Sequence, residues 1–254
     1  MSAQVLGDTR IMLGRSVRHV TRSVDTIITV LVMPIAFLLL FVFVFGGAIQ
    51  AGTDRYVNYL LPGILLIAIA SGISYTAYRL YQDLQNGIFE RFHSMAIARS
   101  SVLWGHVLTS LVSNAISVVA IIGVGLVVGF RSSAGPLAWL AVAGILALVT
   151  LALTWVAVIA GLSASSTDGA TAFSYPIVFL PFVSSAFVPT DTMPGPVRWF
   201  AEHQPVTSIV NSIRALLDRQ PVGSEIGVAL AWCVGMLVLG YAFAMVAYRR
   251  RIRR

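Results

Sequence analysis

Few residues of this chain have the type and spacing that chemistry at an active site requires. The 254 residues include no lysine, and a P-loop needs the lysine of its Gly-x-x-x-x-Gly-Lys motif to hold the β- and γ-phosphates of a nucleotide. The chain therefore has no ordinary nucleotide-hydrolysing site. If it moves a solute uphill, the energy has to come from another source.

Metal and nucleophile chemistry have equally little support. Cys233 stands alone in an apolar run, which excludes a disulfide framework. Ser163, in the stretch Gly161-Leu-Ser-Ala-Ser165, is a candidate nucleophile, but the adjacent apolar segments offer no well-placed histidine. We predict no catalytic residue and no metal site, and keep a membrane-embedded enzyme that uses Ser163 or His203 as an alternative. The four histidines share no metal-ligand spacing: His19, His93, His106 and His203.

Aromatic and hydroxyl side chains recur at helical spacing in three apolar stretches. Such surfaces suit an amphipathic, ring-bearing or lipidic solute. Helix packing or contact with lipid produces the same stripes, and this alternative stays open. The three faces consist of Phe37, Phe41 and Phe45; of Ser71, Tyr75 and Tyr78; and of Tyr175, Phe179 and Phe182.

The elements that position these side chains are predicted to be transmembrane helices. Hydrophobic residues make up 57% of the chain and charged residues 11%, which is typical of an integral membrane protein. A helix crosses the hydrocarbon core with about 20 apolar residues. The sequence therefore predicts an all-α membrane protein with six transmembrane helices, near 26–45, 59–78, 102–130, 136–161, 170–188 and 226–248.

Prolines interrupt two of these predicted spans. Pro34 lies in the first, and Pro176 and Pro181 lie in the fifth. Each removes a backbone donor and favours a kink. Because neighbouring protein or water must satisfy the freed carbonyls inside a membrane, we expect the fifth span to face protein.

The arginines predict the orientation of the chain. Short cytoplasmic loops keep the positive charge, so both termini are expected in the cytoplasm of a multi-pass plasma-membrane protein. The arginines flank apolar spans, so membrane topology accounts for them and no nucleic-acid partner is predicted. One side holds Arg10, Arg15, Arg18, Arg22, Arg79, Arg91, Arg99, Arg249, Arg250, Arg251, Arg253 and Arg254, and the other holds Arg55, Arg131, Arg198, Arg214 and Arg219.

Two segments outside the spans are predicted to contact membrane lipid. In residues 1–25, apolar and arginine side chains fall on different helical faces, as in a helix lying at the headgroups, or in a basic topogenic leader. In the outer region 189–225, Ile209, Ile213 and Leu216/Leu217 recur at helical spacing. We expect two short helices there that re-enter the outer half of the membrane. Residues 249–254 form a basic cytoplasmic tail.

The middle of every predicted span is free of Asp, Glu, Lys and Arg. An ion-coupled carrier usually needs an ionisable relay there. This pattern favours a permease driven by a separate ATPase, and a nucleotide-independent carrier or channel remains the alternative.

The cytoplasmic loop 79–101 has a two-sided helical pattern. Ile88, Phe89, Phe92 and Met95 share one face, whereas Glu90 and Arg91 point away from it. A short helix of this kind fits a groove on a soluble partner. It also fits the lipid surface, which remains the competing interpretation.

Two stretches resemble a known family. The first is Phe89-Glu-Arg-Phe-His-Ser-Met-Ala-Ile-Ala-Arg-Ser-Ser-Val-Leu-Trp-Gly. The second is Phe187-Val-Pro-Thr-Asp-Thr-Met-Pro-Gly-Pro-Val-Arg-Trp-Phe-Ala-Glu-His-Gln-Pro-Val-Thr, followed by Ile213-Arg-Ala-Leu-Leu. Both are similar to segments of ABC-2 type permeases, in the daunorubicin-resistance subgroup of bacterial drug and lipid exporters. Ala96 stands where that family often has proline, which puts the exact contact geometry of the loop in doubt.

The resemblance implies a permease subunit without catalytic activity of its own, which exports a hydrophobic drug-like or lipidic compound from the cytoplasm or the inner leaflet. It implies a second permease, identical or a sister, and two copies of an ATPase that carries ATP and Mg²⁺. It implies a cavity between the first, second and fifth spans of two protomers. From the aromatic and hydroxyl faces at helical spacing, the predicted substrate-path residues are Phe37, Phe41, Ser71, Tyr75, Tyr175, Phe179 and Phe182. The implied ATPase contacts are Phe89, Glu90, Arg91, Phe92, Met95 and Arg99.

Overall fold

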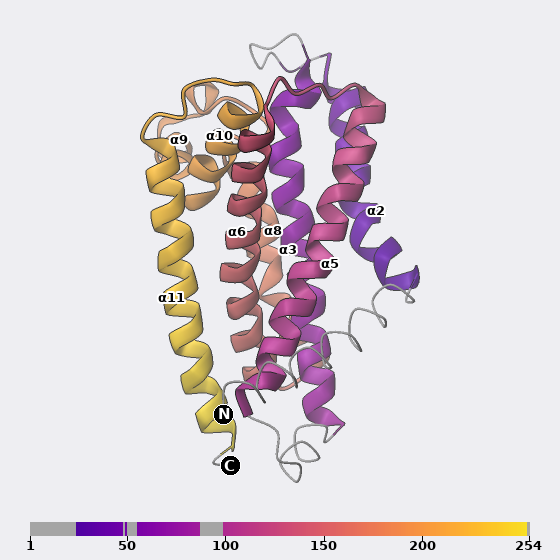
Figure 1. Ribbon diagram of the computed structural model, residues 1–254, viewed down its shortest axis with the longest axis vertical. Coiled ribbons are helices and arrows are strands. Elements are labelled where there is room, and N and C mark those ends of the chain that lie inside the picture. The colour runs from indigo at the N-terminus through magenta and orange to yellow at the C-terminus, as the bar shows by residue number, and fades with distance from the viewer. Residues whose placement is uncertain (1–23, 48, 50–54, 87–98, 253–254) are drawn as a thin grey trace.

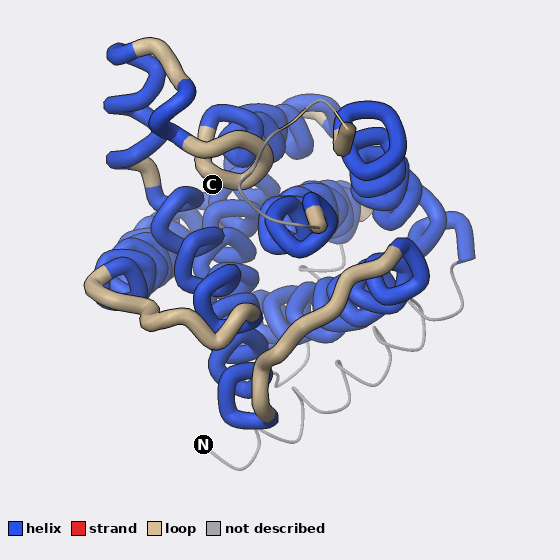
Figure 2. Tube along the Cα trace, turned by 90° about the horizontal axis from the view of Figure 1, so that it is seen from above, coloured by secondary structure: helices blue, strands red, loops and turns tan. Residues whose placement is uncertain are grey.

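The protein is all-helical over the residues that the structure describes, which are 24–47, 49, 55–86 and 99–252. In this computed structural model the helices form an elongated bundle (Figure 1). Seen from above, the helices lie side by side, and no strand occurs in the described ranges (Figure 2). The all-α prediction is confirmed. The predicted interfacial helix, in residues 1–25, falls almost wholly outside the described residues.

Four long helices form the body of the bundle. Helices of this length extend about 42–45 Å, which exceeds the hydrocarbon thickness of a bilayer. Among the described residues, these four are long and apolar enough to cross a membrane, and they match the second, third, fourth and sixth predicted spans. They are α3 (Tyr56–Gln85), α5 (Arg99–Val128), α6 (Pro136–Ser163) and α11 (Glu225–Ile252).

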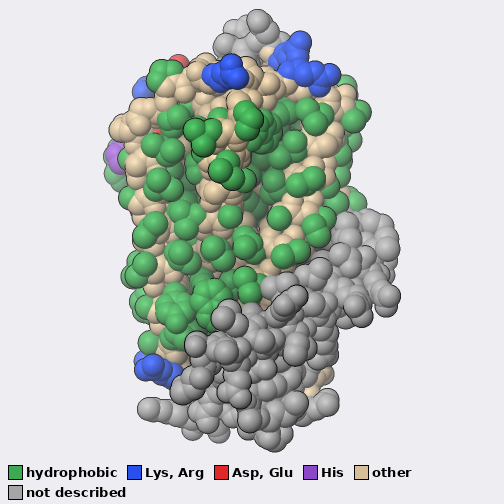
Figure 3. Space-filling model, in the orientation of Figure 1, with side chains coloured by type: hydrophobic (Ala, Val, Ile, Leu, Met, Phe, Trp, Pro, Cys, Tyr) green, Lys and Arg blue, Asp and Glu red, His purple; other side chains and the backbone are tan. Residues whose placement is uncertain are grey.

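Helix α3 is the buried axis of the bundle, whereas α11 lies at its periphery. Of the most apolar stretch of each helix, 78% is buried in α3 and 17% in α11. Helix α3 packs against both α5 and α6, which explains why its stretch 60–70 is apolar on all sides. The visible face of the bundle is largely hydrophobic between its ends (Figure 3), as expected of a surface in contact with lipid.

The two ends of the bundle differ. At one end, here called the α10 end, helices α3, α6 and α11 begin and the short helices α9 and α10 lie (Figure 1). At the other, here called the Gln85 end, α3, α6 and α11 finish and α5 begins.

The first predicted span is a helix with an irregular second half. Helix α2 (Val24–Leu40) contains Pro34 and continues directly into a π-helical turn, η1 (Phe41–Phe45). Together they cover the predicted range 26–45. π-Helical turns are rare and are frequently found at functional sites, and η1 carries two of the predicted aromatic residues, Phe41 and Phe45.

The fifth predicted span is more finely broken than the sequence suggests. It consists of α7 (Thr167–Ala172), α8 (Ser174–Phe179) and the 3₁₀ turn η2 (Leu180–Val183). Pro176 lies in the first turn of α8 and Pro181 lies in η2, so each break falls where a backbone donor is missing. A single helix over 170–188 is therefore wrong. The segment nevertheless packs against α3, a protein-facing position as predicted.

Three short helices follow at the α10 end: η3 (Thr190–Thr192), α9 (Gly195–His203) and α10 (Pro205–Leu217). The predicted amphipathic helix is confirmed in α10, where Ile209, Ile213 and Leu217 are buried. Its first residue is Pro205, a position where the missing backbone N–H leaves no helical hydrogen bond unmade.

The predicted loop 79–101 and tail 249–254 are both shorter than the sequence suggests. Helix α3 continues to Gln85 and α5 begins at Arg99, so Arg79–Gln85 and Arg99–Ser101 are helical. Helix α11 continues to Ile252. Both predictions ended a helix where charged residues begin, but the helices extend past the apolar stretch. Residues 87–98, with most of the predicted ATPase contacts, lie outside the described residues.

The close packing of α3 on α6 depends on Gly161. A Cβ atom at this position would lie 2.9 Å from the backbone oxygen of Ala77 and 3.1 Å from Leu80. We expect Gly161→Val to lower stability by about 1–3 kcal/mol because the two helices would have to separate. The midpoint of thermal unfolding in detergent should fall by about 2–10 °C.

Gly144→Val is the matched control for this prediction. Gly144 lies in the same helix, and a Cβ atom there would meet nothing within 4 Å. The change of helix propensity is the same in both variants. Equal melting points for the two would show that Gly161 is not a packing contact.

Candidate functional site

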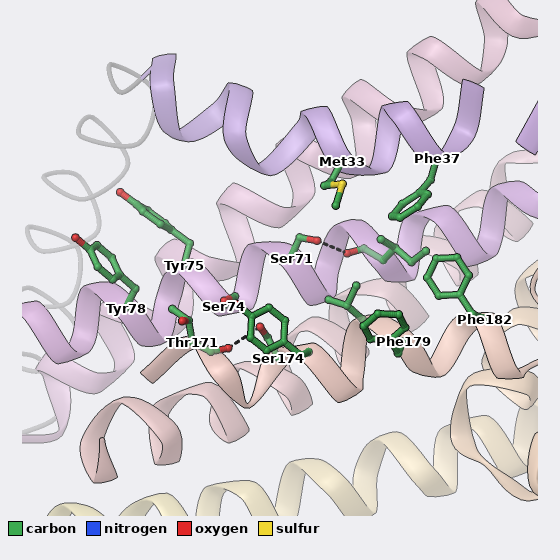
Figure 4. Close-up of a pocket in the computed structure, with 13 residues that line it drawn as sticks. Met33, Phe37, Ser71, Ser74, Tyr75, Tyr78, Thr171, Ser174, Phe179 and Phe182 are labelled. Carbon is green, nitrogen blue, oxygen red and sulfur yellow. Dashed lines mark hydrogen bonds between the residues drawn. The ribbon is translucent and has the colours of Figure 1, made fainter. Parts of the chain in front are cut away.

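A cavity of about 870 Å³ lies between α2, α3 and the broken segment α7–α8–η2 (Figure 4). It extends along α3 from Ile67 to Tyr78, in the half of the helix nearer the Gln85 end. Side chains from all three segments point into it. Its lining consists of Met33, Phe37, Ile67, Ser71, Ser74, Tyr75, Tyr78, Thr171, Ser174, Tyr175, Val178, Phe179 and Phe182.

The structure brings most of the predicted substrate-path residues together at this cavity. Six of the seven line it: Phe37, Ser71, Tyr75, Tyr175, Phe179 and Phe182. The seventh, Phe41, lies one turn beyond Phe37, where its ring stacks on Phe187 at 4.4 Å between centroids. Their role in binding a substrate remains a prediction.

Four polar or flexible residues of the lining were not among the predicted residues: Met33, Ser74, Thr171 and Ser174. Their spacing contained a usable signal. Ser74 lies three residues after Ser71, and Thr171, Ser174 and Val178 recur at helical spacing around Tyr175. Hydroxyl side chains at helical spacing therefore mark this face as clearly as the aromatic ones do.

The lining is neutral, and several of its hydroxyl groups already donate to the backbone. Ser71 Oγ donates to the Ile67 carbonyl oxygen at 2.9 Å, and Ser174 Oγ donates to that of Thr171 at 2.7 Å. None of the lining residues is charged. Arg79 lies just beyond, with its guanidinium carbon 5.8 Å from the ring centre of Tyr75. Such a surface suits an uncharged aromatic or aliphatic ligand.

Five phenylalanines cluster at the end of the cavity nearer the α10 end, and we call them the aromatic cap: Phe37, Phe41, Phe179, Phe182 and Phe187. Phe182 is at the centre, with its ring centroid 5.3 Å from that of Phe37 and 5.0 Å from that of Phe187. The Phe37 contact is edge-to-face and the Phe187 contact is stacked. Each such pair contributes about 0.5–1.5 kcal/mol beyond area burial.

An arginine holds the chain behind the aromatic cap in place. Arg214 of α10 donates through Nε and Nη2 to the backbone oxygen of Tyr59, at 3.2 and 3.1 Å, and through Nη2 to that of Ser185 at 2.8 Å. Its Nη1 donates to Asn211 Oδ1 at 3.0 Å. The guanidinium carbon also lies 3.7 Å from the centre of the Tyr59 ring. We call this group the Arg214 clamp, which joins α3, α10 and the segment after η2.

Burial shifts the pKa values of two charged groups at the Arg214 clamp. It lowers the pKa of Arg214 and raises the pKa of Asp218, at the end of α10, although the Arg214 charge opposes the latter shift. Arginine stays protonated at neutral pH. The clamp therefore keeps a positive charge whose hydrogen bonds go to neutral oxygen atoms.

The segment behind the aromatic cap also approaches α3 closely. A Cβ atom on Gly63 would lie 2.5 Å from the Cβ of Ala186, and the Tyr56 hydroxyl donates to the Phe187 carbonyl oxygen at 2.8 Å. Only glycine permits this approach. Residues 185–187 are thus fixed to α3 on both sides of Pro62.

At the Gln85 end, α3 is tied to two neighbouring segments. Asp83 Oδ2 lies 3.1 Å from His106 Nε2 in α5. The Tyr81 hydroxyl donates to the Ser165 carbonyl oxygen, in the turn between α6 and α7, at 3.0 Å. The two contacts connect the last turns of α3 to α5 and to the turn before α7.

Comparison with known proteins decides the family. A model of the ABC-2 type transporter family matches residues 8–217. The protein belongs to the ABC-2 type transporter family. It is therefore the membrane subunit of an ABC exporter, a multi-pass permease whose family is not itself catalytic, and the family prediction from sequence is confirmed.

Similar permeases are named for drug resistance. The chain is 26% identical over 226 residues to the daunorubicin resistance ABC transporter permease protein DrrB1 of Streptomyces coeruleorubidus, with 89% of this chain and 80% of that protein covered. It is 25% identical over 249 residues to the probable doxorubicin resistance ABC transporter permease protein DrrC of Mycobacterium tuberculosis, with 96% and 89% covered.

The two residues of the alternative, a membrane-embedded enzyme, lie at opposite ends of the described bundle. Ser163 ends α6 at the Gln85 end, whereas His203 ends α9 at the α10 end. The two side chains are therefore too far apart to form a nucleophile and base pair. Within the described ranges, His, Cys, Asp and Glu side chains nowhere gather in a group that could hold a metal ion.

Proposed function

We propose that this permease exports an uncharged, ring-bearing drug-like or lipidic compound from the cytoplasm or the inner leaflet. The observation that carries the proposal is the neutral cavity with its aromatic lining and the aromatic cap at one end. Burial of aromatic and aliphatic surface supplies affinity there, and the hydroxyl groups supply a few polar contacts. The drug-resistance names of the similar permeases support the same class of substrate.

The energy comes from a partner, since ABC-2 permeases work with an ABC ATPase. In our proposal two copies of that ATPase bind ATP and Mg²⁺, and two permeases, identical or sister subunits, assemble above them. The absence of lysine from this chain supports such a division of labour, because a P-loop cannot be formed here.

The proposed topology has six crossings with both termini in the cytoplasm. The segments α2–η1 and α7–α8–η2 add two interrupted crossings to the four long helices. Interrupted helices are tolerated inside a membrane where they line a cavity or pack against protein, and both segments do so here. The arginine distribution supports the orientation, so the Gln85 end is cytoplasmic. Helices α9 and α10 would re-enter the outer half of the membrane.

Coupling to the ATPase would run through the segment 87–98 and the start of α5. ATP-driven closure of the ATPases would move this segment, and α3 would transmit the movement to the cavity. The Asp83–His106 and Tyr81–Ser165 contacts support this route, because they join the end of α3 to α5 and to the start of the α7 segment. Opening would then require the aromatic cap to separate.

The experiment that tests the function compares efflux in three strains. Each strain expresses the permease with its ATPase intact, absent, or disabled in the P-loop lysine, and accumulation of a fluorescent anthracycline is followed. We expect low accumulation only with the intact ATPase. Efflux that is indifferent to all three states would identify a nucleotide-independent carrier instead.

We expect Glu90→Ala or Phe92→Ala to uncouple ATP hydrolysis from export. The reason is the two-sided pattern of the segment, in which Phe92 would bind an apolar groove and Glu90 a polar rim. The measurement is the ratio of transported compound to hydrolysed ATP in proteoliposomes, at matched abundance. Wild-type ratios in both variants would show that the ATPase contact lies elsewhere.

A further inference from the structure

A second hollow lies at the Gln85 end, on the side of the bundle away from α2. It is a groove of about 540 Å³ between α6 and α11, which we call the α6–α11 groove. Its walls are mostly apolar and its polar groups are a hydroxyl and a guanidinium. Its lining consists of Ile159, Leu162, Ser163, Phe243, Val246, Ala247 and Arg250.

The polar and apolar parts of the groove are separated along the helix axes. Ser163 is the last residue of α6 and Arg250 lies in the last turn of α11, so both polar groups are at the membrane-surface rim. Phe243 lies about 10 Å deeper along α11. Phe243 and Val246 are 61% and 46% exposed, which leaves an apolar wall open to acyl chains. This order of polar rim and apolar wall is that of a phospholipid in one leaflet.

The charge of the rim selects the headgroup. The lining includes no acidic residue, and basic side chains gather at this end of α11 (Figure 3). A guanidinium binds a phosphate through paired hydrogen bonds, and a hydroxyl adds a further donor. Basic pockets between transmembrane helices attract anionic headgroups, because each cation near the surface adds to the attraction.

We propose that the α6–α11 groove binds an anionic phospholipid. Its phosphate is held by Arg250 and Ser163, and its acyl chains lie along Phe243 and Val246. The site is separate from the aromatic cavity, which α2, α3 and the α7–α8–η2 segment line. Its occupation does not depend on the proposed export, so the two proposals can fail independently.

Native mass spectrometry of the delipidated permease tests this site. The protein in mild detergent is titrated with phosphatidylglycerol or with phosphatidylcholine of the same acyl chains, and the first bound lipid is counted. We expect the wild type to prefer phosphatidylglycerol by about fivefold or more. Equal binding of the two lipids would overturn the proposal.

Two arginine variants and a filled groove complete the design. Arg250→Gln should abolish the preference, whereas Arg249→Gln removes the same charge one residue earlier, outside the lining, and should retain it. Ala247→Trp should lower retention of both lipids by filling the groove. If Arg250→Gln and Arg249→Gln lose the preference for phosphatidylglycerol equally, the lipid is attracted by the basic end of α11 as a whole, which would contradict the proposal. A second result would also contradict the proposal. If Arg250→Gln binds lipid as the wild type does but no longer co-purifies with the ATPase, the groove is a protein contact.

Discussion

Replacement of Ser74 by tryptophan should stop export while leaving the protein folded. Ser74 lies on α3, and its side chain is one of the small groups that line the cavity (Figure 4). No hydrogen bond of its hydroxyl holds the fold together in the structure as described. An indole at this position would fill the space between α3 and the α8 segment. We expect efflux to fall at least about tenfold, a change that needs only ~1.4 kcal/mol of lost substrate binding.

Two further variants separate blockage from damage. Ser74→Ala removes the hydroxyl without filling the cavity and should keep efflux near the wild-type rate. Ala143→Trp adds the same indole at an exposed position on α6 and should also be active. Anthracycline efflux and membrane abundance are measured for all three variants. Full efflux by Ser74→Trp would show that the substrate passes elsewhere.

The four long helices could be predicted because their apolar length exceeds what a soluble protein needs. The sequence located α3, α5, α6 and α11 to within a few residues at most ends. It failed at the end of α3, where the helix continues through Arg79 and Asp83 to Gln85. Hydropathy marks the part of a helix that lies in lipid, whereas backbone hydrogen bonds continue wherever neighbours support the helix.

The cavity could be predicted in part, because helical spacing shows which side chains share a face. Spacing placed Phe37, Tyr75 and Tyr175 on their faces, and the structure brings those faces together. It could not show that Phe41 packs on Phe187, because that contact joins segments far apart in the sequence. It also could not show that the fifth span breaks into three pieces, since Pro176 indicates a kink but not its size.

The Arg214 clamp was missed for a clear physical reason. Arg214 was predicted to lie on the outer side of the membrane, where arginine side chains are usually exposed. Its partners are backbone oxygens of Tyr59 and Ser185, which have no signature in the sequence. Only the fold shows that α10 brings the Arg214 guanidinium to this part of α3.

Arg214→Met should therefore be among the most disruptive single changes in the α10 end. Methionine keeps the apolar stem but removes every donor, so the backbone oxygens of Tyr59 and Ser185 lose their hydrogen bonds from Arg214. The Ser185 oxygen lies outside a helix, so the loss of this donor costs about 1–3 kcal/mol. The second hydrogen bond to the Tyr59 oxygen and the contact of the cation with the Tyr59 ring are lost as well. We expect a destabilisation of about 3–5 kcal/mol and loss of efflux, because the segment that carries Phe187 would no longer be fixed behind the aromatic cap.

The control for this change is Arg198→Met, on the neighbouring helix α9. Arg198 hydrogen-bonds Glu202 at 2.7 Å, and both side chains are exposed, so its removal should change the midpoint of thermal unfolding little. Arg214→Lys restores the charge but not the paired geometry, and should recover only part of the stability. Unfolding of the purified variants in detergent measures all three. If Arg214→Met and Arg198→Met unfold at the same temperature and Arg214→Met exports normally, the Arg214 clamp does not hold the aromatic cap in place.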